Sequence, residues 1–223
     1  MTKALFFNAI AKITLGILLV GALIFWPAGT FAYPHGWLFM GVLFIPMLTG
    51  GFLLMAKNPA LLKKRLNAKE KLKKQDLVIK LSGLMFVVGF VVAGLDFRYG
   101  WYPLPFGVSI AAAVLLLVSY LLYAEVLREN IYLSRTVEVQ QGQKVIDTGL
   151  YGIVRHPMYS VTLLLFLSMP LVLGSLIALP IFFLYIPIIV VRLLGEETLL
   201  EAELDGYREY KKRVRWRLIP FVF

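Results

Sequence analysis

Cysteine is absent from this chain of 223 residues, and histidine occurs only twice. Without cysteine there are no structural disulfides, no thiolate metal ligands and no cysteine nucleophile, and we expect no metal site. The sequence also contains no G-x-G-x-x-G loop, the pattern with which soluble Rossmann domains hold a dinucleotide. These absences narrow the chemistry that is open to the chain but leave its compartment undecided.

Acidic residues are also scarce, because 13 Asp and Glu stand against 23 Lys and Arg and the formal net charge is +10. Hydrophobic residues instead make up 60% of the chain, and the mean hydropathy is +0.79. Several apolar runs approach the roughly 20 residues needed to cross a bilayer. We therefore predict an all-α fold, a polytopic transmembrane helical bundle rather than a soluble domain.

The apolar runs predict five to six membrane segments. Their expected bounds are 10–26, 37–56, 77–95, 105–127, 157–173 and 176–194. The first run is expected to stay as a helix, because no small-residue cleavage site follows it. The last two runs are joined only by Gly174 and Ser175, which predicts a helical hairpin that enters and leaves from the same side. Pro170, Pro180 and Pro187 would bend this hairpin, and whether it crosses the whole bilayer is left open.

Positive charge predicts the orientation of the spans. The segment 57–76 carries eight Lys and Arg against Glu70 and Asp76, so it should face the cytoplasm. Alternate threading then places the N-terminus, the segment 129–156 and the C-terminal tail in the cytoplasm as well. A basic run of this kind can bind nucleic acid, but attraction to anionic lipid headgroups is the simpler explanation. We therefore expect membrane lipids as partners, no nucleic acid and no obligate protein partner.

Two groups of ionisable residues flank the predicted hairpin. They are Tyr151, Arg155, His156 and Tyr159 at its start and Arg192, Glu196 and Glu197 at its end. Ionisable groups against a membrane are costly unless they serve a site, so the two groups together point to a membrane enzyme. Each residue of the first group also has a structural alternative, as an interfacial aromatic, a positive-inside anchor or a hydrogen-bonding group at a helix end.

The second group has helical spacing. Arg192 and Glu196 are four residues apart and can pair on one helix face, whereas Glu197 points about a quarter-turn away. The structural alternative is an ion pair that stabilises the helix at the membrane boundary. An exposed pair of this kind contributes only about 0.3 to 0.5 kcal/mol, which is too little to explain ionisable groups against an apolar run.

The segments around the hairpin are expected to cover it at one face. Residues 129–155 alternate polar and apolar types and are rich in amides, which predicts an extended loop. Residues 196–216 mix charge with spaced apolar side chains, which fits a surface helix interrupted at Asp205 and Gly206. The residues expected to anchor the tail at the membrane interface are Trp216, Leu218, Ile219, Pro220 and Phe221.

In combination these residues resemble a known family. The motifs are Gly149-Leu150-Tyr151, Arg155-His156-Pro157-Met158-Tyr159, Arg192, Glu196-Glu197, Gly206-Tyr207-Arg208-Glu209-Tyr210-Lys211-Lys212-Arg213-Val214 and Ile219-Pro220. From about Val137 to the end of the chain, their order is similar to that of the isoprenylcysteine carboxyl methyltransferase family and its phospholipid methyltransferase relatives. The first half of the chain agrees mainly in its hydrophobic pattern.

The resemblance implies N-terminal transmembrane helices in residues 1–128 and a catalytic half in residues 129–223. This half would hold S-adenosylmethionine in a pocket capped by cytosolic loops, and a tunnel from the lipid would admit the acceptor. The implied cofactor-binding residues are Gln140, Gln143, Lys144, Val145, Ile146, Tyr151, His156, Pro157, Met158, Tyr159 and Glu196. The implied catalytic residues are Arg192, which would handle the substrate, and Glu197. Gln143, where the family often has histidine, and Leu204-Asp205-Gly206-Tyr207, in place of Phe-Gly, depart from its pattern and leave the acceptor undetermined.

The chemistry of methyl transfer suits these residue types. A sulfonium donor is cationic, so a carboxylate such as Glu196 and an aromatic face such as Tyr151 favour its binding. A carboxylate acceptor, of the prenylated-cysteine type, is already a nucleophile, and Arg192 could orient it. A phospholipid amine would first have to lose a proton, and Glu197 or His156 would then be the candidate base. We expect S-adenosylmethionine-dependent methylation of a small lipophilic acceptor at the cytoplasmic membrane face.

Two other classes of function stay open. Membrane sterol-type reductases are similar in their C-terminal helical architecture and bind NADPH, whose 2′-phosphate would call for extra basic residues around the pocket. The other class is a non-enzymatic scaffold or a small carrier. A carrier is expected to show inverted repeats and polar residues near the membrane midplane. No convincing repeat is seen in the sequence, and its ionisable groups gather at one face.

Overall fold

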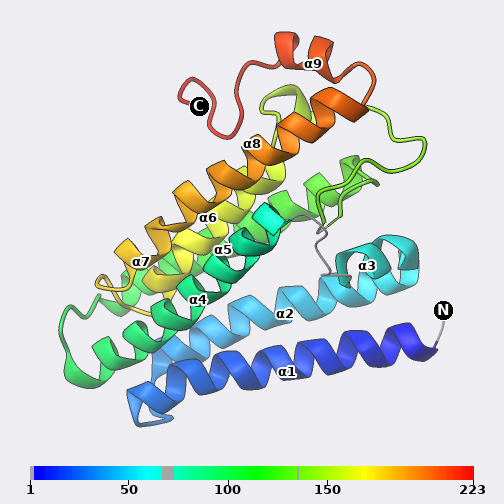
Figure 1. Ribbon diagram of the computed structural model, residues 1–223. Coiled ribbons are helices and arrows are strands. Elements are labelled where there is room, and N and C mark those ends of the chain that lie inside the picture. Colours follow the sequence, from blue (N-terminus) through cyan, green and yellow to red (C-terminus); the bar gives the residue numbers. More distant parts are fainter. Residues whose placement is uncertain (1–2, 67–72, 135) are drawn as a thin grey trace.

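The computed structural model describes residues 3–66, 73–134 and 136–223. In this part of the chain the regular structure is helical, which confirms the predicted all-α bundle (Figure 1). The helices are α1 (Lys3–Ala28), α2 (Pro34–Lys57), α3 (Pro59–Leu66), α4 (Lys73–Tyr99), α5 (Phe106–Glu129), α6 (Pro157–Val172), α7 (Leu179–Phe183), α8 (Tyr185–Glu203) and α9 (Tyr207–Arg213), with one 3-10 turn, η1 (Gly149–Gly152).

Five stretches of helix are long and apolar enough to cross a membrane, and the chain is an integral membrane protein. They are Phe6–Ala28, Pro34–Lys57, Gln75–Tyr99, Phe106–Glu129 and Leu179–Glu203. The first four overlap the predicted spans, and most of their ends lie beyond the apolar runs, because polar residues continue a helix without breaking it. The helices therefore form where the apolar runs predict them.

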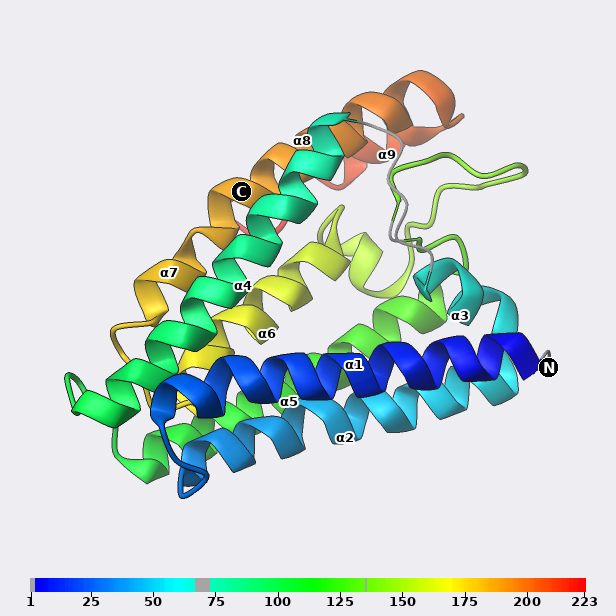
Figure 2. The ribbon, with the colours of Figure 1, turned by 60° about the horizontal axis from the view of Figure 1, so that its bottom comes forward.

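The helices share two ends, which we call the loop end and the tip end. Figure 1 shows α1 and α2 side by side along one edge, with α4, α5, α6 and α8 inclined against them. The tip end gathers the connections between α1 and α2, between α4 and α5 and between α6 and α7. The loop end contains the start of α1, α3, α9 and residues 136–156. Figure 2 shows α4 and α8 running side by side toward this end.

The predicted basic loop 57–76 begins with a short helix. Asn58 precedes α3, and its side-chain oxygen accepts a hydrogen bond from the backbone N–H of Leu61 at 3.0 Å. This is the usual way in which an asparagine caps the start of a helix, and Pro59 suits the first helical position. The middle of the predicted loop, residues 67–72, lies outside the described residues.

The predicted hairpin is present, but its connection is longer than expected. Residues 173–178 separate α6 from α7, so the prediction that Gly174 and Ser175 alone join the two segments is wrong. Gly174 has a φ of 71°, and such a turn ends α6 early. The second arm is divided at Leu184, where α7 gives way to α8. Pro187 has no N–H to donate one turn back, which accounts for this interruption.

The tip of the hairpin packs against the other connections of the bundle. The backbone N–H of Leu104 donates to the carbonyl of Gly174 at 3.0 Å, and the Tyr33 hydroxyl donates to the carbonyl of Leu173 at 2.5 Å. Both arms therefore run from the loop end to the tip end. The arm α6 has 16 residues, or about 24 Å of helix, which is near the lower limit of a span.

The second arm also extends further than predicted. We expected a separate surface helix in residues 196–216, but α8 continues without a break to Glu203. A change from apolar to charged residues does not end a helix, and the single Gly195 within this stretch does not break it. The predicted interruption is confirmed, because Gly206 has a φ of 81° and α9 begins at Tyr207. The charged end of α8 is therefore a rigid continuation of the membrane helix.

Close approach of α1 and α4 depends on one glycine. A Cβ atom at Gly94 would lie 2.5 Å from the carbonyl oxygen of Ile24, whereas a Cβ atom at Gly83 on the same helix would have no neighbour within 4 Å. Small residues at such contacts let membrane helices pack backbone to backbone. The pair of glycines therefore offers a matched test of this packing.

We expect Gly94→Ala to destabilise the protein by about 1–3 kcal/mol, because α1 and α4 must move apart. Gly83→Ala is expected to be neutral or to stabilise by up to about 1 kcal/mol, since alanine is the better helix former. Thermal unfolding of both variants in one detergent compares them. Shifts of the same sign and size in the two variants would contradict the packing described here.

Candidate functional site

A partly open cleft lies at the loop end between the end of α5, η1, the start of α6, the end of α8 and α9. The predicted site residues that line it are Gln143, Lys144, Val145, Ile146, Tyr151, His156, Met158, Tyr159, Arg192 and Glu196. Predicted site residues that are far apart in the sequence thus lie around the same cleft. Gln140, Pro157 and Glu197 do not line it. The roles assigned to all these residues stay predictions.

One wall of the cleft is built on η1. Gly149 opens this turn with a φ of 55°, and the turn buries the ring of Tyr151. The Tyr151 hydroxyl accepts a hydrogen bond from the side-chain amide of Asn130 at 3.0 Å, and the Tyr210 hydroxyl donates to the Tyr151 carbonyl at 2.7 Å. Burial raises the pKa of Tyr151, so its hydroxyl is neutral at physiological pH.

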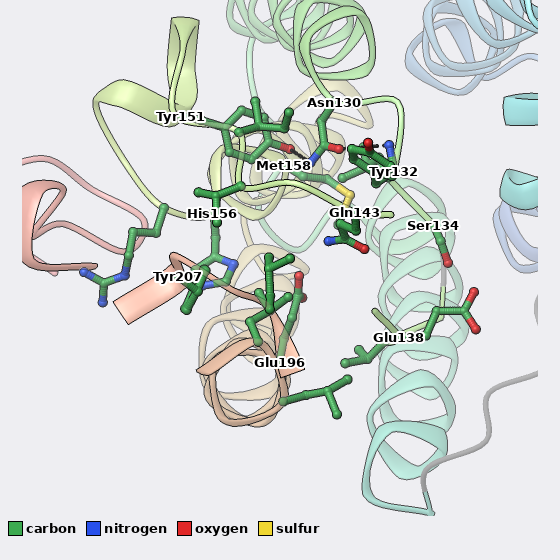
Figure 3. Close-up of a pocket in the computed structure, with 18 of the residues that line it drawn as sticks. Asn130, Tyr132, Ser134, Glu138, Gln143, Tyr151, His156, Met158, Glu196 and Tyr207 are labelled. Atoms are coloured by element: carbon green, nitrogen blue, oxygen red, sulfur yellow. Dashed lines mark hydrogen bonds between the residues drawn. The ribbon is translucent and has the colours of Figure 1, made fainter. Parts of the chain in front are cut away.

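The polar loop 136–148 forms a second wall of the cleft. It contains no helix, in agreement with the predicted extended loop. Gln143 accepts a hydrogen bond from the backbone N–H of Gln140 through its side-chain oxygen at 2.9 Å. The side-chain amide of Gln140 donates in turn to the carbonyl of Tyr132. Gln140 therefore holds the loop together from outside the cleft, while Gln143 lies on its surface (Figure 3).

The opposite wall carries the ionisable pair of α8. Arg192 and Glu196 both line the cleft, and they share one face of α8, as their spacing predicts. The Tyr159 hydroxyl connects them, because it donates to a carboxylate oxygen of Glu196 and accepts from Nε of Arg192 at 3.1 Å. Figure 3 shows the Glu196 carboxylate directed into the space, across from Tyr151 and Met158. A cationic ligand would meet both a carboxylate and aromatic rings there.

Glu197 does not line the cleft, and its carboxylate is surrounded by basic side chains. Its carboxylate accepts from Nε of Arg155 at 2.7 Å and from Nε of Arg217 at 3.0 Å, and it lies 3.3 Å from Nε2 of His156. Its side chain is only 4% exposed. Glu197 therefore links α8, the residues before α6 and the C-terminal tail.

The tail takes part in this linkage more than the sequence indicates. The backbone N–H groups of Arg155 and His156 donate to the carbonyls of Trp216 and Arg217, each at 2.9 Å. Leu218, predicted to anchor the tail at the membrane interface, is instead 4% exposed and belongs to the main core, so that prediction is wrong for this residue. Phe221, in contrast, is exposed, as an interfacial residue would be.

Several lining residues were not predicted, and Tyr207 is the most informative of them. It lines the cleft at the start of α9, opposite Asn130 and Tyr132. Its buried hydroxyl has no hydrogen-bond partner among the described residues. Burial, together with the nearby carboxylates of Glu197 and Glu196, raises the pKa of Tyr207, so it keeps a proton to donate. A buried donor of this kind is expected to meet a ligand or a water.

Comparison with known proteins adds two findings. The Delta(14)-sterol reductase TM7SF2 of Mus musculus is 28% identical over 171 residues, which cover 66% of this chain and 41% of the reductase. The chain thus spans less than half the length of this relative. Assignment to the isoprenylcysteine carboxyl methyltransferases stays a prediction. Residues 106–204, from the first residue of α5 to just past α8 and including most of the cleft, match the phospholipid methyltransferase family.

Proposed function

We propose that this chain is an integral membrane methyltransferase that uses S-adenosylmethionine and acts on a small lipophilic acceptor. The observation that carries the proposal is the cleft itself. It joins the Glu196 carboxylate to tyrosine rings and hydroxyls, within the segment that matches a methyltransferase family. No separate soluble domain is needed for the cofactor, because the ends of α5, α6 and α8 form the cleft together with η1, the loop 136–148 and α9.

The donor side of the cleft fits a cationic cofactor. When bound, S-adenosylmethionine supplies a methyl group activated on a positively charged sulfur. The rings of Tyr151 and Tyr159 offer π-faces to such a charge, and Glu196 offers a carboxylate. The hydroxyl of Tyr207 is a buried donor that a polar group of the ligand can accept from. Val145 and Leu199 supply the apolar contacts that a mostly apolar ligand site needs.

The acceptor side favours a carboxylate over an amine. Arg192 is buried beside the cleft, and its guanidinium can orient a carboxylate through charge-assisted hydrogen bonds. An amine would need a base, but Glu197 is engaged by two arginines and His156, and it lies outside the cleft. A carboxylate is a nucleophile without proton removal, so holding it in line with the methyl group is sufficient. We therefore propose O-methylation, with N-methylation of a phospholipid amine as the alternative.

Charge supports placing the cleft at the cytoplasmic membrane face. Lys57 at the end of α2 and Lys63 and Arg65 in α3 belong to the basic segment 57–76, which the positive-inside rule assigns to the cytoplasm. Lys12 of α1 adds a further positive charge there, because its ammonium donates to the carbonyl of Leu66 at the end of α3. A lipophilic acceptor dissolved in the same leaflet would reach the cleft without crossing the membrane. Substrate delivery would then come from the lipid and donor delivery from the cytosol.

A reductase is the second candidate, because a sterol reductase is among the relatives. Such an enzyme would bind a nicotinamide dinucleotide in the same cleft, and NADPH would need basic side chains for its 2′-phosphate. Of the basic residues that line the cleft, Arg155 is committed to Glu197 and to the carbonyls of Val214 and Arg215. Lys144 also lines the cleft and could meet a phosphate, so our preference for the methyl donor rests on the Glu196 carboxylate and on the family match.

Glu196→Gln is expected to weaken binding of S-adenosylhomocysteine about 10-fold or more, because a hydrogen bond to a charged group is lost from the cleft. Glu201→Gln is the matched control, since Glu201 lies on α8 but pairs with Lys211 outside the cleft. Microscale thermophoresis of the detergent-purified variants measures both dissociation constants. Unchanged affinity in Glu196→Gln would remove this residue from the donor site.

A further inference from the structure

The residues that line the cleft all come from the second half of the chain, among those the structure describes, yet the first half reaches one of them directly. Gln75 lies in the first turns of α4 and is 3% exposed. A buried amide among apolar helices costs free energy unless it is hydrogen-bonded. The Gln75 amide therefore requires a hydrogen-bond partner at this position.

The partner of Gln75 is Arg192 on α8. The side-chain oxygen of Gln75 accepts from Nη1 of Arg192 at 3.4 Å, and its side-chain amide donates to the backbone carbonyl of Arg192 at 3.4 Å. One amide thus contacts both the guanidinium and the backbone of the same arginine. The Tyr159 hydroxyl accepts from Nε on the same guanidinium, so two neutral groups fix its plane.

A glycine makes room for this contact. A Cβ atom at Gly195, one turn after Arg192, would lie 2.5 Å from the side-chain nitrogen of Gln75. Glycine inside a helix costs stability relative to alanine, so its place here needs a packing reason. The close approach of the Gln75 amide supplies that reason. Burial, the two contacts and the glycine are separate observations, and all three concern the side chain of Gln75.

We propose that Gln75 is a positioning residue that holds the Arg192 guanidinium in the orientation in which it receives the acceptor. This inference rests on the proposed function of Arg192 at the acceptor side of the cleft. It assigns a role at the site to a residue of the first half, before the segment that matches the family. Because Gln75 acts through Arg192, it should influence the acceptor and leave the donor almost unaffected.

The test uses the full-length protein reconstituted in phosphatidylcholine vesicles, with a farnesylated N-acetylcysteine as a carboxylate probe and radiolabelled S-adenosylmethionine as donor. Gln75→Met keeps the length of the side chain but removes its polar atoms. We expect it to raise the acceptor KM about 10-fold, with the dissociation constant of S-adenosylhomocysteine within about twofold of wild type. Gly195→Ala should shift the acceptor KM in the same direction, since the added methyl group displaces the amide.

Ser82→Ala, elsewhere on α4, is the control, because the Ser82 hydroxyl donates to the carbonyl of Val78, one turn back on the same helix. A double variant gives the sharpest readout. In an Arg192→Ala background, Gln75→Met should cause no further loss, because there is no guanidinium left to position. The proposal would be overturned if the losses caused by the two substitutions multiplied in the double variant. An unchanged acceptor KM in Gln75→Met would overturn it as well.

Failure of the proposed function has a different signature. The wild type would then neither bind S-adenosylhomocysteine nor transfer a methyl group to the probe. The coupling of Gln75 with Arg192 would still be measured, because the melting temperatures of the two single variants and the double variant should be non-additive. Additive melting temperatures would contradict the contact itself, whatever reaction the site performs.

Discussion

Replacing Arg192 with alanine is expected to lower the rate of methyl transfer about 100-fold or more while S-adenosylhomocysteine still binds within about threefold of wild type. Removing a buried guanidinium that holds a charged group costs roughly 2–5 kcal/mol. A 100-fold loss of rate corresponds to a free-energy cost within this range. The donor is held instead by Glu196 and the tyrosines of the cleft. Steady-state kinetics and donor titration on the same preparation separate the two effects.

Arg192→Lys refines this expectation. Lysine keeps the positive charge but not the planar fork that contacts a carboxylate at two points, so only partial recovery of turnover is expected. Full recovery would mean that Arg192 supplies charge alone. Equal losses of donor affinity and turnover in Arg192→Ala would overturn the division between a donor side and an acceptor side.

Replacing Glu197 with alanine is expected to lower stability more than any substitution on the cleft surface. Arg155 and Arg217 would lose their shared carboxylate inside the protein, and breaking a buried ion pair costs about 3–5 kcal/mol. In a chain of this size such a loss corresponds to a fall in melting temperature of roughly 10 °C. Differential scanning fluorimetry in detergent measures it.

Asp147→Ala is the matched control for this prediction. Asp147 forms an ion pair with Arg213 at 2.8 Å, but the two side chains are 37% and 65% exposed. An exposed pair contributes at most about 1 kcal/mol, so a shift of only a few degrees is expected. If Glu197 instead served as a base, Glu197→Gln would abolish turnover with an unchanged melting temperature. That result would contradict the structural role of Glu197 as a link between α8, the residues before α6 and the C-terminal tail.

The membrane helices could be predicted from the sequence because their signal is local. An apolar run of sufficient length predicts a helix wherever it lies. That Arg192 and Glu196 share one face of α8 also follows from their spacing, whereas only the fold turns this face toward the cleft. The ends of α6 and α8 could not be predicted as well from the sequence. The length of the turn after Gly174 depends on packing, and the continuation of α8 to Glu203 depends on the absence of a strong helix breaker.

The contacts that complete the site could not be predicted in the same way. Gln75 and Arg192 are 117 residues apart, and neither residue type alone signals the other. Arg217 appears in the sequence as one basic residue among many in the tail, and only the fold brings it to Glu197. Tyr207 had a local signal, because it belongs to the tyrosine-rich motif after Gly206, but its place in the cleft required the turn at that glycine.

Titration of the purified wild-type protein with S-adenosylhomocysteine, and in parallel with NADPH, tests the central claim most directly. Isothermal calorimetry in one detergent buffer gives both affinities without knowledge of the acceptor. We predict saturable binding of one S-adenosylhomocysteine per chain and no saturable binding of NADPH. Binding of NADPH alone would contradict the methyltransferase account and favour a reductase, and binding of neither ligand would remove the donor site from the cleft.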